Sequence, residues 1–197
     1  MTLSIQPTTA LSVEKFLQLP ETKPASEYFN GQIYQKPMPQ GKHSTLQIEL
    51  ASAINQVAKP KKLAYALTEL RCTFSGLSIV PDIAVFEWER IPLDAKGSIA
   101  NKFEIPPDWI IEILSPVRAS RSRRVQSTNR VIRKITFSIQ NGAKLGWLLD
   151  ADDESIMIFE PNKLPELKEQ QDILPVLSVI QNWQLTVADV FSWLSFV

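Results

Sequence analysis

Apolar residues recur every three or four positions in three stretches of the chain, and this spacing predicts three helices. The first, over 12–19, begins at a serine that can cap the free backbone N–H groups of its first turn. The second, over 43–59, is amphipathic and ends where a proline follows it. The third starts at Ser127 or Thr128 and ends before the Asn-Gly pair at 141–142, which accepts the left-handed conformation typical of a helix end.

Shorter apolar runs, some alternating with polar residues and some continuous, predict β-strands. Asn30-Gly31 separates the first two because both residues tolerate the positive φ angles of a tight hairpin turn. Helices and strands do not alternate as in a repeated βαβ fold, so we expect an α/β (α+β) fold in which one mixed β-sheet is flanked by helices. The predicted strands are 27–29, 32–34, 63–74, 78–86, 109–114, 146–149 and 156–159.

Length and composition narrow the class of protein. A chain of 197 residues that is 44% hydrophobic is expected to form one domain, 1–197. Cys72 is the only cysteine, so no internal disulfide can form and a reducing compartment, the cytoplasm, is expected. His43 is the only histidine, which excludes the ligand sets of zinc sites. No signal peptide or membrane-spanning run is recognisable.

The formal net charge is zero, but the basic residues are unevenly distributed. Without the seven that lie between 118 and 134, 14 basic residues remain against 21 acidic ones. The basic segment either binds a polyanion such as DNA or neutralises the acidic remainder, in this chain or in a partner subunit. Its members are Arg118, Arg121, Arg123, Arg124, Arg130, Arg133 and Lys134.

Two carboxylates occupy positions where burial is expected. Glu112 interrupts an apolar strand, and Asp82 follows Pro81 at the head of another. A buried carboxylate costs several kcal/mol unless a partner or a cation compensates it. Neighbouring strands would let the two side chains share magnesium, which prefers oxygen ligands and needs only one or two protein carboxylates. The alternatives for Glu112 are a structural pair with an arginine and a strand end that reaches solvent.

Five short motifs resemble, in their order, those of the Uma-two family of restriction endonucleases, which belongs to the PD-(D/E)XK nuclease superfamily. The resemblance covers most of the chain and implies a restriction-endonuclease-like core. The motifs are SEYFNGQI at 26–33, KHS at 42–44, VPDIAV at 80–85, PDWIIEILSP at 107–116 and GWLLD at 146–150.

This resemblance implies that Asp82 and Glu112 bind magnesium, or manganese, while a lysine helps to activate the attacking water. In the superfamily that lysine stands two residues beyond the glutamate, where this chain has Leu114. Family members commonly take it from the following helix instead, and Lys134 is the matching residue.

The family pattern also places Glu27 and His43 near the site. It differs from this chain after the Glu112 strand, where the family usually has a mixed polar stretch and this chain has only basic charge.

The leading hypothesis is therefore a magnesium-dependent endonuclease that cleaves DNA. A nuclease fold that has lost catalysis and serves as a DNA-binding or protein-interaction module is the main alternative. A homodimer is also expected, with the apolar segment 187–197 as a candidate contact.

Overall fold

The computed structural model describes residues 11–115 and 128–197. Its helices are α1 (Val13–Leu17), α2 (Gly41–Ala58), α3 (Thr128–Gln140) and α4 (Val187–Ser192), with short 3₁₀ turns at Lys59–Lys61, Trp88–Arg90 and Ser178–Ile180. Its strands are β1 (Ser26–Phe29), β2 (Gln32–Gln35), β3 (Ala64–Thr68), β4 (Cys72–Phe74), β5 (Leu77–Ile79), β6 (Ile83–Glu87), β7 (Trp109–Ile113), β8 (Leu145–Asp150), β9 (Ser155–Phe159) and β10 (Glu166–Glu169).

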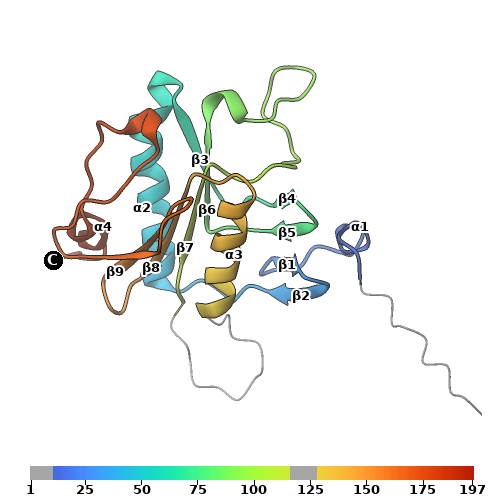
Figure 1. The fold of residues 1–197 in the computed structure, drawn as a ribbon, viewed down its shortest axis with the longest axis horizontal. Coiled ribbons are helices and arrows are strands. Elements are labelled where there is room, and N and C mark those ends of the chain that lie inside the picture. The colour runs from blue at the N-terminus through green and yellow to red at the C-terminus, as the bar shows by residue number, and fades with distance from the viewer. Residues whose placement is uncertain (1–10, 116–127) are drawn as a thin grey trace, which may run out of the picture.

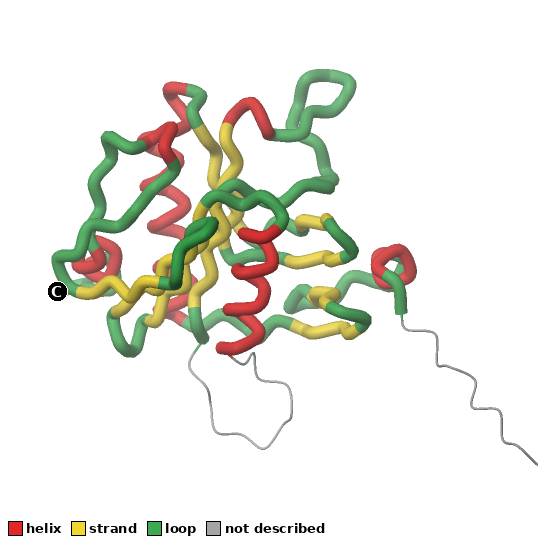
Figure 2. The backbone as a smooth tube through the Cα atoms, viewed as in Figure 1, coloured by secondary structure: helices red, strands yellow, loops and turns green. Residues whose placement is uncertain are grey.

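The strands form two sheets, shown in Figure 1 and Figure 2. The larger has the order β10-β9-β8-β7-β6-β3 and is mixed, because β7 and β8 are parallel while the other neighbours are antiparallel. The smaller has the order β2-β1-β5-β4 and is antiparallel. The predicted mixed α+β fold is confirmed, whereas the expectation of one sheet was wrong.

Helices cover the two faces of the larger sheet, α2 on one and α3 on the other (Figure 1). Strand alternation explains this arrangement: Trp109, Ile111 and Ile113 of β7 face the α2 side, whereas Ile110 faces the α3 side. Gly146 in β8 allows α3 to approach closely, because a Cβ at that position would clash with Ile135 of the helix. Glu112, between Ile111 and Ile113, therefore faces α3.

The expected strands over 63–74 and 78–86 were wrong in extent, because each is two strands that belong to different sheets. The first breaks at Glu69, whose φ of 52° is incompatible with an extended strand. The second breaks at Val80-Pro81-Asp82, where proline has no N–H for a sheet hydrogen bond. Apolar residues flank both breaks, so the pattern alone hides them. As a result, Asp82 lies where the chain passes from one sheet to the other.

The other predicted elements agree closely with the structure. Ser12 caps α1 through Lys15 N–H, although the helix ends at Leu17 and not at Leu19. Asn30 and Gly31 have φ angles of 49° and 78° in the β1–β2 turn. Helix α3 already includes Thr128, and the alternative cap Ser127 lies outside the described residues. Within the described residues, no helix combines the length and apolar character needed to cross a bilayer.

Candidate active site

All the residues proposed for catalysis from sequence meet where the two sheets join. Glu27 comes from β1, His43 from the first turn of α2, Asp82 from the link between β5 and β6, Glu112 from β7, and Lys134 from α3. Each side chain is buried, although they come from elements that are far apart in the sequence. The tertiary structure therefore brings these five side chains together.

Asp82 stands immediately before β6 and is a neighbour of Glu112 in the adjacent strand β7. The antiparallel register pairs Ile83 with Ile111, so one further step places Asp82 opposite Glu112. The Asp82 carboxylate also reaches across to β7, where its Oδ2 accepts a 2.7 Å hydrogen bond from the backbone N–H of Ile113. The two carboxylates are therefore neighbours, as the metal hypothesis requires.

Lys134 joins two carboxylates across the site. Its Nζ lies 2.7 Å from Glu27 Oε1 and 2.8 Å from Glu112 Oε1. Burial by itself would lower the pKa of Lys134, but Glu112 and Glu27 outweigh burial and hold that pKa above its usual range. Glu27 Oε1 also accepts the N–H of Val80 at 2.9 Å, which fixes the carboxylate that holds the lysine. Lys134 is therefore charged at neutral pH and has one N–H remaining for a further acceptor.

Asp82 is held by groups on both of its oxygens. Its Oδ1 accepts a 2.8 Å hydrogen bond from Lys36 Nζ, and its Oδ2 lies 3.2 Å from His43 Nε2. Burial would raise the pKa of Asp82, but Lys36 and His43 outweigh it and keep this pKa well below its usual range. Asp82 is consequently an anion under all physiological conditions.

Sequence analysis missed Lys36, which follows β2. Its Nζ donates to Asp82, to Glu69 Oε1 at 2.8 Å and to the carbonyl of Val80 at 3.0 Å. These acceptors use all three donors of the ammonium group, so Lys36 positions Asp82 and has no N–H left for a water or a phosphate. Gln47 of α2 supports the same cluster by donating to Glu69 and to the Asp82 carbonyl. Nothing in the local sequence of Lys36 marks it, because it stands in a polar, proline-rich link.

The pKa of Glu112 is shifted in the opposite direction from that of Asp82. Burial raises its pKa to about 8, more than Lys134 lowers it, and the neighbouring Asp82 and Glu27 raise it further. Apart from the Lys134 ion pair, neither oxygen of Glu112 has a hydrogen-bond partner among the described residues. The alternatives of an arginine partner and of a solvent-exposed strand end were wrong, since the partner is a lysine and the side chain is buried.

The donor groups fit a hard divalent cation. Among residues 11–115 and 128–197, no cluster of three or more His, Cys, Asp or Glu side chains is arranged as a metal site. Magnesium does not need such a cluster, because one or two carboxylates, waters and a substrate phosphate can complete its coordination. Glu112 Oε1 contacts only Lys134, and Glu112 Oε2 and His43 Nδ1, both buried, have no hydrogen-bond partner within the described residues. Buried polar atoms of this kind can accept or coordinate a further group.

The basic segment is only partly described by the structure. Arg118, Arg121, Arg123 and Arg124 lie outside the described residues. Arg130 and Arg133 belong to α3, where Arg133 is exposed and Arg130 is half-buried. The Arg130 guanidinium lies over the ring of Tyr34, with its Cζ 4.0 Å from the ring centroid.

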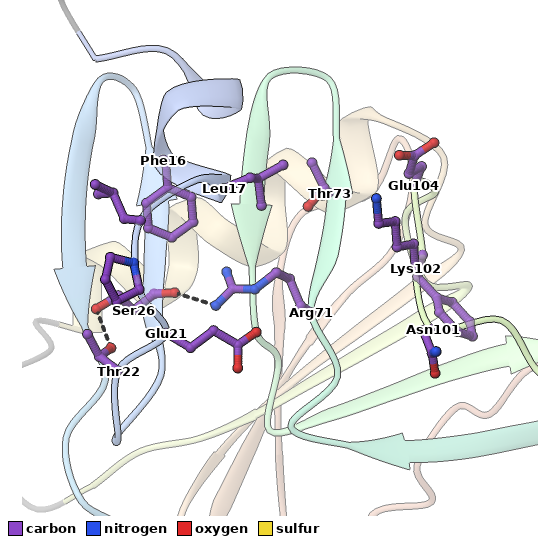
Figure 3. A pocket seen from close by; sticks show the side chains of 13 residues that line it. Phe16, Leu17, Glu21, Thr22, Ser26, Arg71, Thr73, Asn101, Lys102 and Glu104 are labelled. Atoms are coloured by element: carbon purple, nitrogen blue, oxygen red, sulfur yellow. Dashed lines mark hydrogen bonds between the residues drawn. The ribbon is translucent and has the colours of Figure 1, made fainter.

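A pocket of about 420 Å³ lies elsewhere, between α1, the start of β1, β4 and the 101–104 link (Figure 3). Arg71 lines this pocket, and its guanidinium donates to Ser78 Oγ at 3.0 Å and to the Ser26 carbonyl at 3.1 Å. None of the proposed catalytic side chains lines it. We do not assign the active site to this pocket, because Arg71 already donates hydrogen bonds to other groups of the protein.

Comparisons with known proteins concern the family and the fold. A sequence model of a family described as "putative restriction endonuclease" matches residues 13–188. The crystal structure of a putative nuclease from Anabaena variabilis superposes with a TM-score of 0.88 at 46% sequence identity, covering 94% of this chain and 99% of that one. A search of curated proteins found no match.

Proposed function

Because this chain belongs to the Uma-two family of putative restriction endonucleases, we propose that it hydrolyses phosphodiester bonds of DNA with the help of magnesium or manganese. One observation carries the proposal: two neighbouring buried carboxylates, Asp82 and Glu112, face a lysine that contacts one of them.

In this proposal Asp82 and Glu112 hold the cation through carboxylate oxygens. The bound cation would supply Lewis acidity, which lowers the pKa of water and offsets charge on the phosphate. Hydrolysis forms a bond between the water oxygen and phosphorus, breaks one phosphorus–oxygen ester bond and transfers a proton to the leaving alcohol.

Lys134 is the residue proposed to orient the water or to stabilise charge on the phosphate. Its contacts with Glu27 and Glu112 fix the ammonium group and leave one N–H available. The lysine slot of the superfamily holds Leu114, but the ammonium of Lys134 reaches Glu112 from α3 at 2.8 Å. This contact favours an active site over a fold that has lost catalysis. Glu27 and His43 are proposed as positioning residues, for Lys134 and Asp82 respectively.

The expected activity is nicking of supercoiled plasmid DNA that requires a divalent cation. Magnesium or manganese should support it, EDTA should stop it, and excess magnesium should restore it, because the proposed water activation depends on the cation. Agarose gel electrophoresis of the plasmid measures the result. Nicking that persists in EDTA would contradict the metal role, and DNA binding without nicking in either metal would favour the inactive DNA-binding alternative.

A further inference from the structure

Arg130 and Tyr34 form a pair beside the proposed site. Tyr34 is the cross-strand partner of Glu27, so the two side chains share a face of the β1–β2 hairpin. Arg130 stands four residues before Lys134, which places both cations on the same side of α3. Lys134 contacts Glu27 and Arg130 lies over Tyr34, so the Arg130–Tyr34 pair lies next to the site, one helical turn closer to the start of α3.

The positive charge of Arg130 is not neutralised by any acid of the chain. Every acidic residue lies in the described ranges, because 1–10 and 116–127 contain none, and no acid forms an ion pair with Arg130. Two other arginines in the described ranges differ in this respect. Arg90 pairs with Asp108, and Arg71, which lies over Phe16, donates to Ser78 and Ser26. Arg130 is thus held in place by an aromatic ring while its charge has no counterpart in the protein.

A guanidinium in this setting suits a phosphate. An arginine over an aromatic ring keeps its N–H donors, which can bind two phosphate oxygens at once. The ring also limits the conformations of the arginine, so less entropy is lost on binding. Lys36 and Lys134 are buried and already contact carboxylates. Arg130 is therefore the half-buried cation nearest along α3 to the proposed chemistry.

We propose that Arg130, supported by Tyr34, binds a phosphate of the nucleic-acid strand adjacent to the phosphate that is cleaved. The inference rests on the proposed function for the position of the cleaved phosphate. Four residues of α3, about 6 Å of rise, separate Arg130 from Lys134, which exceeds the roughly 3.4 Å of duplex axis per phosphate of one strand, so the two cations can reach different phosphates. The ligand is a backbone phosphate, so the subsite adds affinity and sets the register of the strand without reading a base.

The test measures binding of a fluorescein-labelled DNA duplex by anisotropy in EDTA, where cleavage is absent, over a series of KCl concentrations. R130Q is expected to lower affinity ~10-fold and to reduce the slope of log affinity against log salt by about 0.9, the value for one lost phosphate contact. R130K should keep the slope but lose affinity, because lysine preserves the charge and not the two-pronged geometry. Y34F should bind as the unchanged protein does, because it keeps the ring.

The control is K163Q, which removes one positive charge from the exposed turn after β9 and should leave the slope unchanged. Equal slopes for R130Q and K163Q, or no binding by the unchanged protein, would overturn the subsite. Plasmid nicking with magnesium is measured separately. If R130Q reduces the slope but the unchanged protein does not nick DNA, the phosphate-binding role of Arg130 is supported and the nuclease proposal is refuted. If the unchanged protein nicks DNA but R130Q and K163Q have equal slopes, the nuclease proposal is supported and the subsite is refuted.

Discussion

Replacing Glu112 by glutamine is expected to lower the rate of magnesium-dependent DNA cleavage by about 10³-fold or more, and Asp82→Asn should have a similar effect. Each change removes one of the two carboxylates that hold the cation in the proposed site. A loss of this size corresponds to roughly 4 kcal/mol of transition-state stabilisation, which is within the range that a catalytic metal supplies. The measurement is the initial rate of plasmid nicking at saturating magnesium. E112Q should keep the fold, because glutamine has the shape of glutamate and its amide oxygen can still accept a hydrogen bond from Lys134.

Asp108→Asn is the matched control for this loss. Asp108 also follows a proline and is also fully buried, but its partners are Arg90 and Lys144, and it accepts the N–H of Glu87. It stands four residues before Glu112, immediately before β7. D108N should lose ~1–3 kcal/mol of stability and keep its cleavage rate per folded molecule. Cleavage retained in both E112Q and D82N, or lost equally in D108N, would refute the assigned roles.

The stability of the metal-free protein is expected to fall as pH rises from about 5 to 8, and E112Q should remove most of this fall. In the folded state burial raises the pKa of Glu112 to about 8, against an ordinary value of 4.5. Between these values the folded protein keeps a proton that the unfolded chain has lost, so rising pH favours unfolding by up to roughly 1.4 kcal/mol per pH unit. The total effect is a few kcal/mol. Urea unfolding in EDTA at several pH values measures it.

Asp82 and Lys134 do not produce this slope. The lowered pKa of Asp82 makes stability rise with pH, but only below its ordinary value of 3.8. Lys134 stays charged throughout the window because its pKa is raised. E49Q, which changes an exposed glutamate of α2, should keep the slope of the unchanged protein. Magnesium should flatten that slope, because a cation favours the ionised carboxylate. Identical slopes for E112Q and the unchanged protein would show that Glu112 is not the titrating group.

Much of the site could be predicted from sequence because an acidic residue within or beside an apolar strand is expected to be buried. Glu112 stands inside an apolar run, and Asp82 stands at the head of one, so both required compensation. The Uma-two resemblance added Lys134, Glu27 and His43, and the structure brings all of them to one place. Their chemical roles, the bound metal and the homodimer stay predictions.

The second sheet and Lys36 could not be predicted for a common physical reason. Local periodicity reports whether a segment is extended, and it does not report which sheet the segment joins. The breaks at Glu69 and at Val80-Pro81-Asp82 carry strands from one sheet to the other without interrupting the apolar pattern. Lys36 reaches Asp82 only because the β1–β2 hairpin folds against that crossing, so its role follows from tertiary structure alone.

The most direct measurement of the shared cation is anomalous X-ray scattering from a crystal grown with a manganese salt. The prediction is a single strong peak between the two strands, about 2.1 Å from one oxygen of Asp82 and one oxygen of Glu112, a distance usual for small divalent ions. Crystals at saturating manganese in which these carboxylates contact only Lys36 and Lys134, with no peak between them, would contradict the proposed metal site.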